Sequence, residues 1–309
     1  DSEAKTKLSE YISNTRDENS IQNKVRVFIN ASKHKDSAIN IVKEVIHDLG
    51  RTIDIEPIIN SFRSIKPPKR PLIVDWNMDS EIIKNPACQT DDVFLVFTGY
   101  AKQTGSVPVE LIDSLLAGYG ASMILLKDHS AQLYQNGINQ LGHDFDSTIT
   151  SIKKIIREFG AKRVFTIGSS GGGVGALCYG LELGAENILT FSGPTNLNWK
   201  FLKKNKDLRA RSAIRNLNKK LSEEQLDLRA SIQNSHHKPR IDVYFGEENP
   251  GDKIQALNIQ DLPNVHLQAL SNTDKHGTIG VAFTRGLFTA EIDRMIGINS
   301  IRDKSKGLV

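Results

Sequence analysis

Two serines flanked by glycines lie near the middle of the chain, in Gly168-Ser169-Ser170-Gly171-Gly172. The five residues fit the pattern G-x-S-x-G with Ser170 at its centre. That pattern is typical of a nucleophilic serine on a sharp turn from a strand to a helix, where larger neighbours would clash. The helix N-terminus and the N–H group of Gly171 can stabilise an oxyanion there. The stretch therefore predicts Ser170 as a nucleophile and Gly171 as one oxyanion-hole donor.

The same glycines allow three other interpretations. A P-loop would need Lys and Ser or Thr after its second glycine, but Val174 and Gly175 follow Gly173, so that motif is excluded. Gly171, Gly173 and Ala176 fit a dinucleotide-binding loop, yet no acidic residue ends a second strand about 20 positions later, as ribose binding requires. A purely structural interpretation also stands, in which the glycines only allow close packing of a helix on a sheet.

A nucleophilic serine needs a base and an acid that orients the base. In the α/β-hydrolase arrangement these follow in the chain order Ser, acid, His. Of the eight histidines, only His276 follows both the serine and the last predicted strand and directly precedes the closing helix, so His276 is the predicted base. We predict Asp252 as the acid because it begins the helix after a strand; Glu248, closer to the strand end, is the alternative.

The second oxyanion-hole donor should come from the loop after an earlier strand. The segment 96–105, VFTGYAKQTG, is the candidate loop. We predict the N–H group of Tyr100 as the donor, with that of Ala101 as the second choice. An ordinary glycine-containing turn is nearly as good an interpretation of this loop.

The elements that must position these residues alternate between strands and helices. Strands are predicted at 71–77, 91–99, 121–128, 162–168, 186–193, 240–246 and 264–270, and helices at 108–120, 144–160, 173–184 and 279–297. Continuous apolar strands separated by helices predict a mostly parallel sheet with helices on both faces. Residues 194–239 form a charged helical insert at the position of a lid.

Residues 1–65 have a different pattern. Apparent strands at 24–30 and 51–59 flank a helix at 36–50. This predicts a β-α-β segment, either as a small subdomain or as extra strands on the main sheet. The segment 66–71, KPPKRP, is the best candidate linker, so the main domain is predicted at 66–300 and a polar tail at 301–309.

The run LKDHSAQLYQNGINQLGHDFDSTITSIKKIIREFGAKRVFTIGSSGGGVGALCYGLELGAENILTFSGPT resembles α/β-hydrolase-fold domains of bacterial polysaccharide and glycan gene clusters, some fused to tetratricopeptide repeats or glycosyltransferases. The later runs GEENPGDKIQAL, NVHLQAL and DKHGTIGVAFTRG are similar to the half of those domains that carries the acid and the histidine. The resemblance covers about residues 90–297 but not 1–65. It implies the α/β-hydrolase fold and a triad of Ser170, Asp252 and His276. Many members of that group carry a bulkier residue in place of Gly172 or Gly173, so a more open loop is expected here.

Bulk composition narrows the class of protein. The 309 residues are 39% hydrophobic and 25% charged with a net charge of +4, which is typical of a globular protein. No apolar run approaches the roughly 20 residues of a membrane helix, and the polar N-terminus lacks a signal-peptide core. Cys88 and Cys178 lack metal-ligand or disulfide spacing, which predicts free thiols, a cytoplasmic location, and no metal or cofactor.

Positive charge gathers in the insert. Residues 200–240 contain twelve Lys or Arg against four Asp or Glu. A solvated helical surface is the preferred explanation; an anionic partner, such as an acidic glycan, a phosphorylated substrate or an acyl-carrier domain, is the functional one. Nucleic acid is not expected, because aromatic residues are not interleaved with these charges.

Together these features predict a serine hydrolase acting on an acyl ester, such as that of a carbohydrate or glycan. Acyl transfer through the same acyl-enzyme is one alternative. A non-catalytic binding module that keeps the fold is the other.

Overall fold

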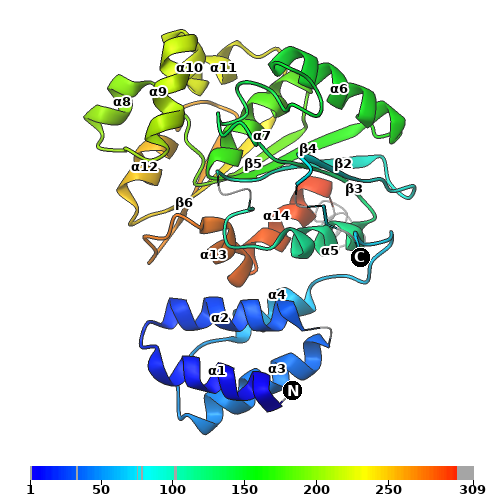
Figure 1. The fold of residues 1–309 in the computed structure, drawn as a ribbon, viewed down its shortest axis with the longest axis vertical. Helices are drawn as coiled ribbons and strands as arrows, with labels where there is room; N and C mark the ends of the chain where they lie inside the picture. Colours follow the sequence, from blue (N-terminus) through cyan, green and yellow to red (C-terminus); the bar gives the residue numbers. More distant parts are fainter. Residues whose placement is uncertain (1, 33, 75, 78, 101–102, 298–309) are drawn as a thin grey trace, which may run out of the picture.

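A computed structural model describes residues 2–32, 34–74, 76–77, 79–100 and 103–297 (Figure 1). The predicted tail at 301–309 and the alternative donor Ala101 lie outside these residues.

The centre is a seven-stranded sheet in the order β1-β3-β2-β4-β5-β6-β7. Its strands are β1 (Ile82–Asn85), β2 (Asp92–Phe97), β3 (Ser122–Leu126), β4 (Arg163–Ser169), β5 (Asn187–Phe191), β6 (Arg240–Gly246) and β7 (Val265–Leu270). All neighbouring strands are parallel except β1 and β3, so the predicted mostly parallel sheet is confirmed.

The first strand of the main domain was predicted wrongly. Residues 71–74, 76 and 77 form no strand, and Val74 is 95% exposed. The sheet edge is instead the four-residue β1, which pairs antiparallel with β3. A strand of four residues is too short to show the alternation of apolar and polar residues that identifies a strand. The apolar run at 71–74 was misleading because its side chains are largely exposed to solvent.

Helices cover both faces of the sheet (Figure 1). One layer contains α6 (Phe145–Glu158), α7 (Gly171–Glu182) and α12 (Pro250–Leu257); the other contains α5 (Val109–Tyr119), α13 (Thr278–Thr284) and α14 (Leu287–Ile296). Successive side chains of a strand point to opposite faces. In β2, Phe94 and Val96 accordingly join the core beneath α5 and α14, while Leu95 and Phe97 join the core beneath α6 and α7.

The predicted closing helix at 279–297 is two helices. It breaks between α13 and α14 at Gly286, whose φ of 72° lies in the left-handed region. The predicted insert is helical and consists of α8 (Trp199–Lys204), α9 (Arg211–Lys220), α10 (Glu223–Leu226) and α11 (Leu228–Asn234). These four helices lie on the same side of the sheet as α7 (Figure 1).

The prediction for the N-terminal segment is wrong. Its described residues contain no strand; they form α1 (Ser2–Asn14), α2 (Glu18–Ala31), α3 (Lys35–Asp48) and α4 (Glu56–Arg63). The alternation at 24–30 conceals a helical period, because Ile21, Val25 and Ile29 are buried four residues apart while Val27 is 43% exposed. At 51–59, Pro57 lies in the first turn of a helix instead of interrupting a strand.

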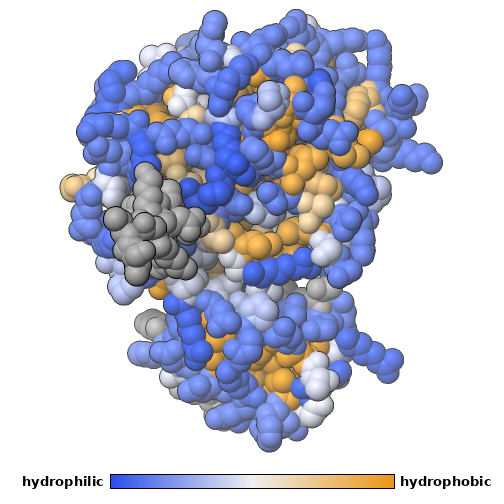
Figure 2. Space-filling model, turned by 180° about the vertical axis from the view of Figure 1, so that it is seen from behind, coloured by the Kyte–Doolittle hydropathy of each residue, from blue (hydrophilic) through white to orange (hydrophobic). Residues whose placement is uncertain are grey.

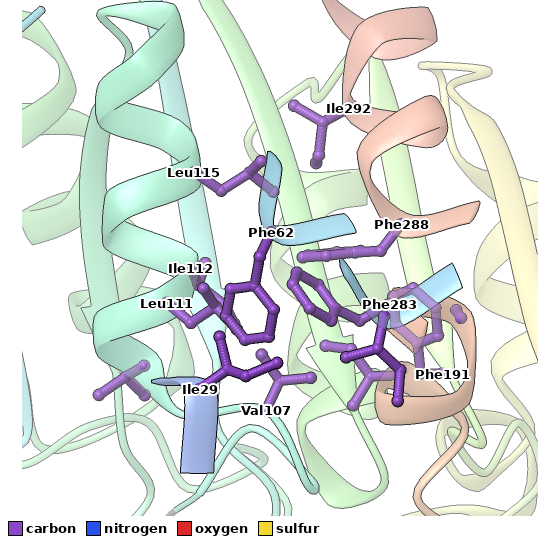
Figure 3. Close-up of a cluster of buried hydrophobic side chains, with 14 of the residues drawn as sticks. Ile29, Phe62, Val107, Leu111, Ile112, Leu115, Phe191, Phe283, Phe288 and Ile292 are labelled. Carbon is purple, nitrogen blue, oxygen red and sulfur yellow. The ribbon is translucent and has the colours of Figure 1, made fainter. Parts of the chain in front are cut away.

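These N-terminal helices pack against the main domain. Figure 3 shows Ile29 of α2 and Phe62 of α4 among side chains from α5, α13 and α14. The rings of Phe62 and Phe283 meet edge to face, with their centroids 5.4 Å apart. The segment 66–71 is anchored rather than loose, since Arg70 forms a buried ion pair of 2.8 Å with Asp113.

Seen from behind, the smaller N-terminal lobe and the larger body are both mainly hydrophilic, with hydrophobic areas on each (Figure 2). Cys88 and Cys178 are free thiols, as predicted. None of the helices in the described parts of the chain has the length and apolar character needed to cross a bilayer.

Candidate active site

Ser170 lies on the turn between β4 and α7. Its backbone angles, φ 55° and ψ −125°, fall in a region that non-glycine residues rarely adopt. The Ser170 N–H group donates to the Phe191 carbonyl at 2.8 Å, and its carbonyl accepts from the Gly173 N–H group at 2.8 Å. The turn is therefore held from both sides. Ser170 keeps partial exposure, whereas Ser169 is buried.

The flanking glycines are required by close packing. A Cβ atom on Gly168 would collide with the Gly172 carbonyl oxygen, and one on Gly172 would collide with the Phe97 carbonyl oxygen. A Cβ atom on Gly173 would lie 2.6 Å from Cα of Gly193. The expectation of a more open loop is therefore wrong, because the glycine run brings α7 against the ends of β2 and β5.

The structure brings Ser170, His276 and Asp252 together. Nε2 of His276 lies 2.8 Å from Oγ of Ser170, and Nδ1 of His276 lies 2.9 Å and 3.1 Å from the two carboxylate oxygens of Asp252. His276 lies in the loop between β7 and α13, while Asp252 lies in the first turn of α12. Three separate segments thus converge at the carboxyl ends of the parallel strands.

Asp252 is held as a buried carboxylate. Its side chain has 0% exposure, and its N–H group donates to the side chain of Asn249, which caps α12, at 3.0 Å. A carboxylate in the first turn of a helix is stabilised by the helix dipole. The alternative acid, Glu248, is exposed at the surface, and the structure places Asp252, not Glu248, on His276.

Arg209, between α8 and α9, contacts this pair. Its Nη1 atom donates to Asp252 and lies 2.9 Å from Nδ1 of His276, while its Nε atom donates to Asp207 at 2.7 Å. Burial opposes the charge of Arg209, but the two carboxylates outweigh it, so the pKa of the guanidinium is raised. Burial alone would raise the pKa of Asp207; the bonds from Arg209 lower it below its ordinary value.

The contact with Nδ1 depends on the histidine tautomer. A guanidinium nitrogen is always a donor, so Nη1 of Arg209 can bond to Nδ1 of His276 only when the imidazole proton is on Nε2. A histidine that accepts a proton from Ser170 must carry its own proton on Nδ1, directed at Asp252. In that tautomer Arg209 bonds to Asp252 and not to His276.

Two backbone N–H groups, those of Gly171 and Tyr100, lie near Ser170. Gly171 begins α7, and the position of a Cβ atom on Gly171 lies 3.5 Å from the backbone nitrogen of Tyr100. Within the described chain, neither N–H group has an acceptor. Both are therefore available to a negatively charged oxygen at this place.

A small cavity adjoins these groups beneath the insert. Its volume is about 50 Å³, and it is lined by Ser170, Gly171, Tyr100 and His276 on one side and by apolar residues such as Leu202 and Ile214 on the other. Since a buried water molecule needs roughly 10–15 Å³, the cavity has room for only a few atoms.

Sequence analysis missed Arg209, Asp207 and Gln255. The Gln255 side chain donates to Asp207 at 3.2 Å and accepts from the Thr195 N–H group at 2.9 Å, which ties the insert to α12. Arg209 belongs to the charged run that was assigned to a solvated surface. The one available signal was the acid Asp207 two residues before an arginine within that basic run.

No family model and no curated protein matches the sequence. Solved structures are similar at low identity. An acylaminoacyl peptidase in complex with Z-Gly-Gly-Phe-chloromethyl ketone has a TM-score of 0.51 at 15% identity, over 74% of this chain and 40% of that one. A protein of unknown function from Staphylococcus aureus subsp. aureus Mu50 has a TM-score of 0.50 at 12% identity, over 70% and 93%.

The capsule O-acetyltransferase of Neisseria meningitidis serogroup A gives a TM-score of 0.47 at 15% identity, over 69% of this chain and 90% of that one. The chain spans only 41% of the length of the Pyrococcus horikoshii acylaminoacyl peptidase. The predicted fold is confirmed: the chain has the α/β-hydrolase fold, with a helical insert over one end of a mostly parallel sheet.

Proposed function

We propose that the protein is a serine hydrolase that cleaves a short-chain acyl ester, with Ser170, His276 and Asp252 as its catalytic triad. The observation that carries this proposal is the continuous chain of hydrogen bonds from Oγ of Ser170 through the imidazole of His276 to the buried carboxylate of Asp252. A merely structural glycine turn does not need such a chain. It also does not need a strained serine backbone.

The geometry supports a two-step reaction. Oγ of Ser170 attacks the acyl carbonyl carbon while Nε2 of His276 takes the hydroxyl proton, and the N–H groups of Gly171 and Tyr100 bind the oxyanion. His276 then returns the proton to the leaving alcohol, which gives an acyl-serine. A water molecule deprotonated by His276 then attacks the acyl-serine; the bond between the acyl carbon and Oγ breaks, His276 returns the proton to Oγ of Ser170, and the acid is released.

The small cavity beneath the insert supports a short acyl group such as acetyl. Its volume of about 50 Å³ and its apolar wall fit the methyl group of an acetyl ester better than a long chain. The resemblance to domains of polysaccharide clusters favours a carbohydrate as the alcohol. In that case the enzyme would act as a glycan deacetylase, and the same acyl-serine could instead pass its acetyl group to a sugar hydroxyl.

Labelling with a fluorophosphonate tests the nucleophile. We expect the wild type to be labelled, Ser170→Ala and His276→Ala to lose labelling, and the matched variant Ser169→Ala to keep it. Absence of labelling in folded wild-type protein would favour the non-catalytic binding module. Adding a sugar acceptor during turnover of p-nitrophenyl acetate separates the two chemistries, because acyl transfer yields an acetylated sugar and hydrolysis yields acetate.

A further inference from the structure

A second and larger cavity touches the site from the other side. It has a volume of about 650 Å³ and lies between the N-terminal helices and the segment that carries His276. Its walls come from α2, Asp54 and Pro57 of α4 on one side and from residues 272–285, which include α13, on the other. Figure 1 shows α2 facing α13 across the boundary between the N-terminal lobe and the main domain. We call this cavity the interlobe cleft.

His276 lines both the interlobe cleft and the small cavity, whereas Ser170, Gly171 and Tyr100 line only the small cavity. The base must return its proton to the leaving oxygen, so the alcohol part of an ester lies on the His276 side of the reacting carbon. The acyl part then extends into the small cavity beneath the insert. The alcohol part extends past His276 into the interlobe cleft.

The cleft carries an excess of cationic side chains. Arg26, Lys275 and Arg285 line it together with two acids, Glu18 and Asp54. Both acids already accept local hydrogen bonds, Glu18 from the Gln22 side chain at 3.3 Å and Asp54 from the Glu56 N–H group at 3.1 Å.

Lys275 and Arg285 form no ion pair with any residue that the structure describes; Arg285 donates to the Ser271 carbonyl at 2.9 Å. Arg26 is 1% exposed, and its guanidinium lies 3.9 Å from where a Cβ atom on Gly280 would be. Burial lowers the pKa of Arg26 to about 10, so its guanidinium stays charged at neutral pH.

We infer that the interlobe cleft binds the alcohol part of the substrate, and that this part carries an anionic group, a carboxylate or a phosphate, which Arg26, Lys275 and Arg285 recognise. This inference rests on the proposed function for the identity of the reacting end. Binding of the anion by these cationic side chains does not depend on which reaction the site performs. The N-terminal helices thereby supply one wall of the substrate site.

Two esters of matched shape test the inference: 4-acetoxybenzoate, which is anionic at neutral pH, and the neutral 4-acetoxybenzamide. After division by their spontaneous hydrolysis rates, we expect wild-type kcat/KM to favour the benzoate. The double variant Lys275→Gln/Arg285→Gln should lower that ratio by about tenfold. The control Lys153→Gln/Arg157→Gln, an equal charge change on exposed residues of α6, should leave it unchanged. A wild-type ratio near one, or equal ratios in all three proteins, overturns the inference.

Binding to Ser170→Ala, followed by ligand-observed NMR, separates this inference from the proposed function. Tighter binding of the benzoate than of the benzamide, lost when Lys275 and Arg285 are also replaced, supports the cleft even if the wild type hydrolyses neither ester. Turnover of both esters with equal binding supports the hydrolase and overturns the anionic cleft.

Discussion

The insert contacts His276 through Arg209, whereas the N-terminal helices only line the cleft that His276 also lines. The insert reaches the reacting groups through charge: Arg209 bridges Asp207 and Asp252, and Gln255 ties Asp207 to α12. The N-terminal helices reach the main domain through apolar contacts such as Phe62 on Phe283. The cavity beneath the insert is small, at about 50 Å³, and the interlobe cleft is large and polar, at about 650 Å³.

This difference separates chemistry from binding. On the proposed function, we expect a change at Arg209 to alter the orientation of Asp252 and His276 and so to affect the rate for every ester. We expect a change in the N-terminal helices to leave those groups in place and to alter stability, or the affinity for the alcohol part. The variants below test this division, beginning with the group on which the insert acts.

Asp252→Asn should have the largest effect. The amide cannot hold His276 with its proton on Nδ1, so we expect kcat/KM for p-nitrophenyl acetate to fall by roughly 10³–10⁴. Glu248→Gln, which neutralises the neighbouring exposed acid, is the matched control and should stay within a factor of two of the wild type, on the order of ordinary surface substitutions. A large loss at Glu248 with little loss at Asp252 would reverse the assignment of the acid.

Phe62→Ala should act on stability alone. Removing this buried ring from its edge-to-face contact with Phe283 should lower the free energy of unfolding by about 3–4 kcal/mol, as for other large-to-alanine core substitutions. Urea denaturation measures the loss. Val74→Ala, at a position 95% exposed, is the control and should change stability by less than about 0.5 kcal/mol.

The same Phe62→Ala protein tests the division itself. Below its unfolding transition it should hydrolyse p-nitrophenyl acetate with wild-type kcat, because Phe62 lies in the core under α13 and not at the reacting atoms. A loss of kcat in folded protein would show that the N-terminal helices also position the catalytic groups.

Arg209→Met should lower kcat by about tenfold to a hundredfold, because a misplaced orienting group costs rates of this size. Without the guanidinium, the buried carboxylate of Asp252 loses a donor, and the orientation in which Asp252 holds His276 is less fixed. Arg209→Lys, which keeps the charge but not the forked donor geometry, should recover only part of the rate. Arg211→Met is the control, since Arg211 lies over the ring of Trp199 at 5.8 Å. A rise in KM without a fall in kcat would instead indicate that Arg209 binds the substrate.

The three triad residues proposed from the sequence lie together in the structure, whereas several segments around them were predicted wrongly. Ser170, His276 and Asp252 could be found because the chemistry restricts both the residue types and their order along the chain. The parallel strands could be found because a strand buried on both faces, such as Ser122–Leu126, is continuously apolar.

Local sequence patterns did not predict the structure correctly where tertiary contacts determine it. In residues 24–30 the spacing suits a strand and a helix almost equally, and only the packing of Ile21, Val25 and Ile29 against the other N-terminal helices selects the helix. Arg209 could not be distinguished from the other cations of the insert. Its role depends on Asp252, which is 43 residues away in the chain.

The smallest expected effect concerns the acyl group. Leu202 of α8 is buried and lines the small cavity, so Leu202→Ala should enlarge the space beside Ser170. We expect the ratio of kcat/KM for p-nitrophenyl butanoate to that for the acetate to rise by about threefold to tenfold, since each methylene in an apolar pocket is worth about 1 kcal/mol or more. Leu217→Ala is the matched control, because Leu217 of α9 is equally buried but does not line the cavity. Both variants should lose stability similarly, so an equal change of ratio in the two would mean that looseness of the insert, and not cavity size, sets the acyl preference.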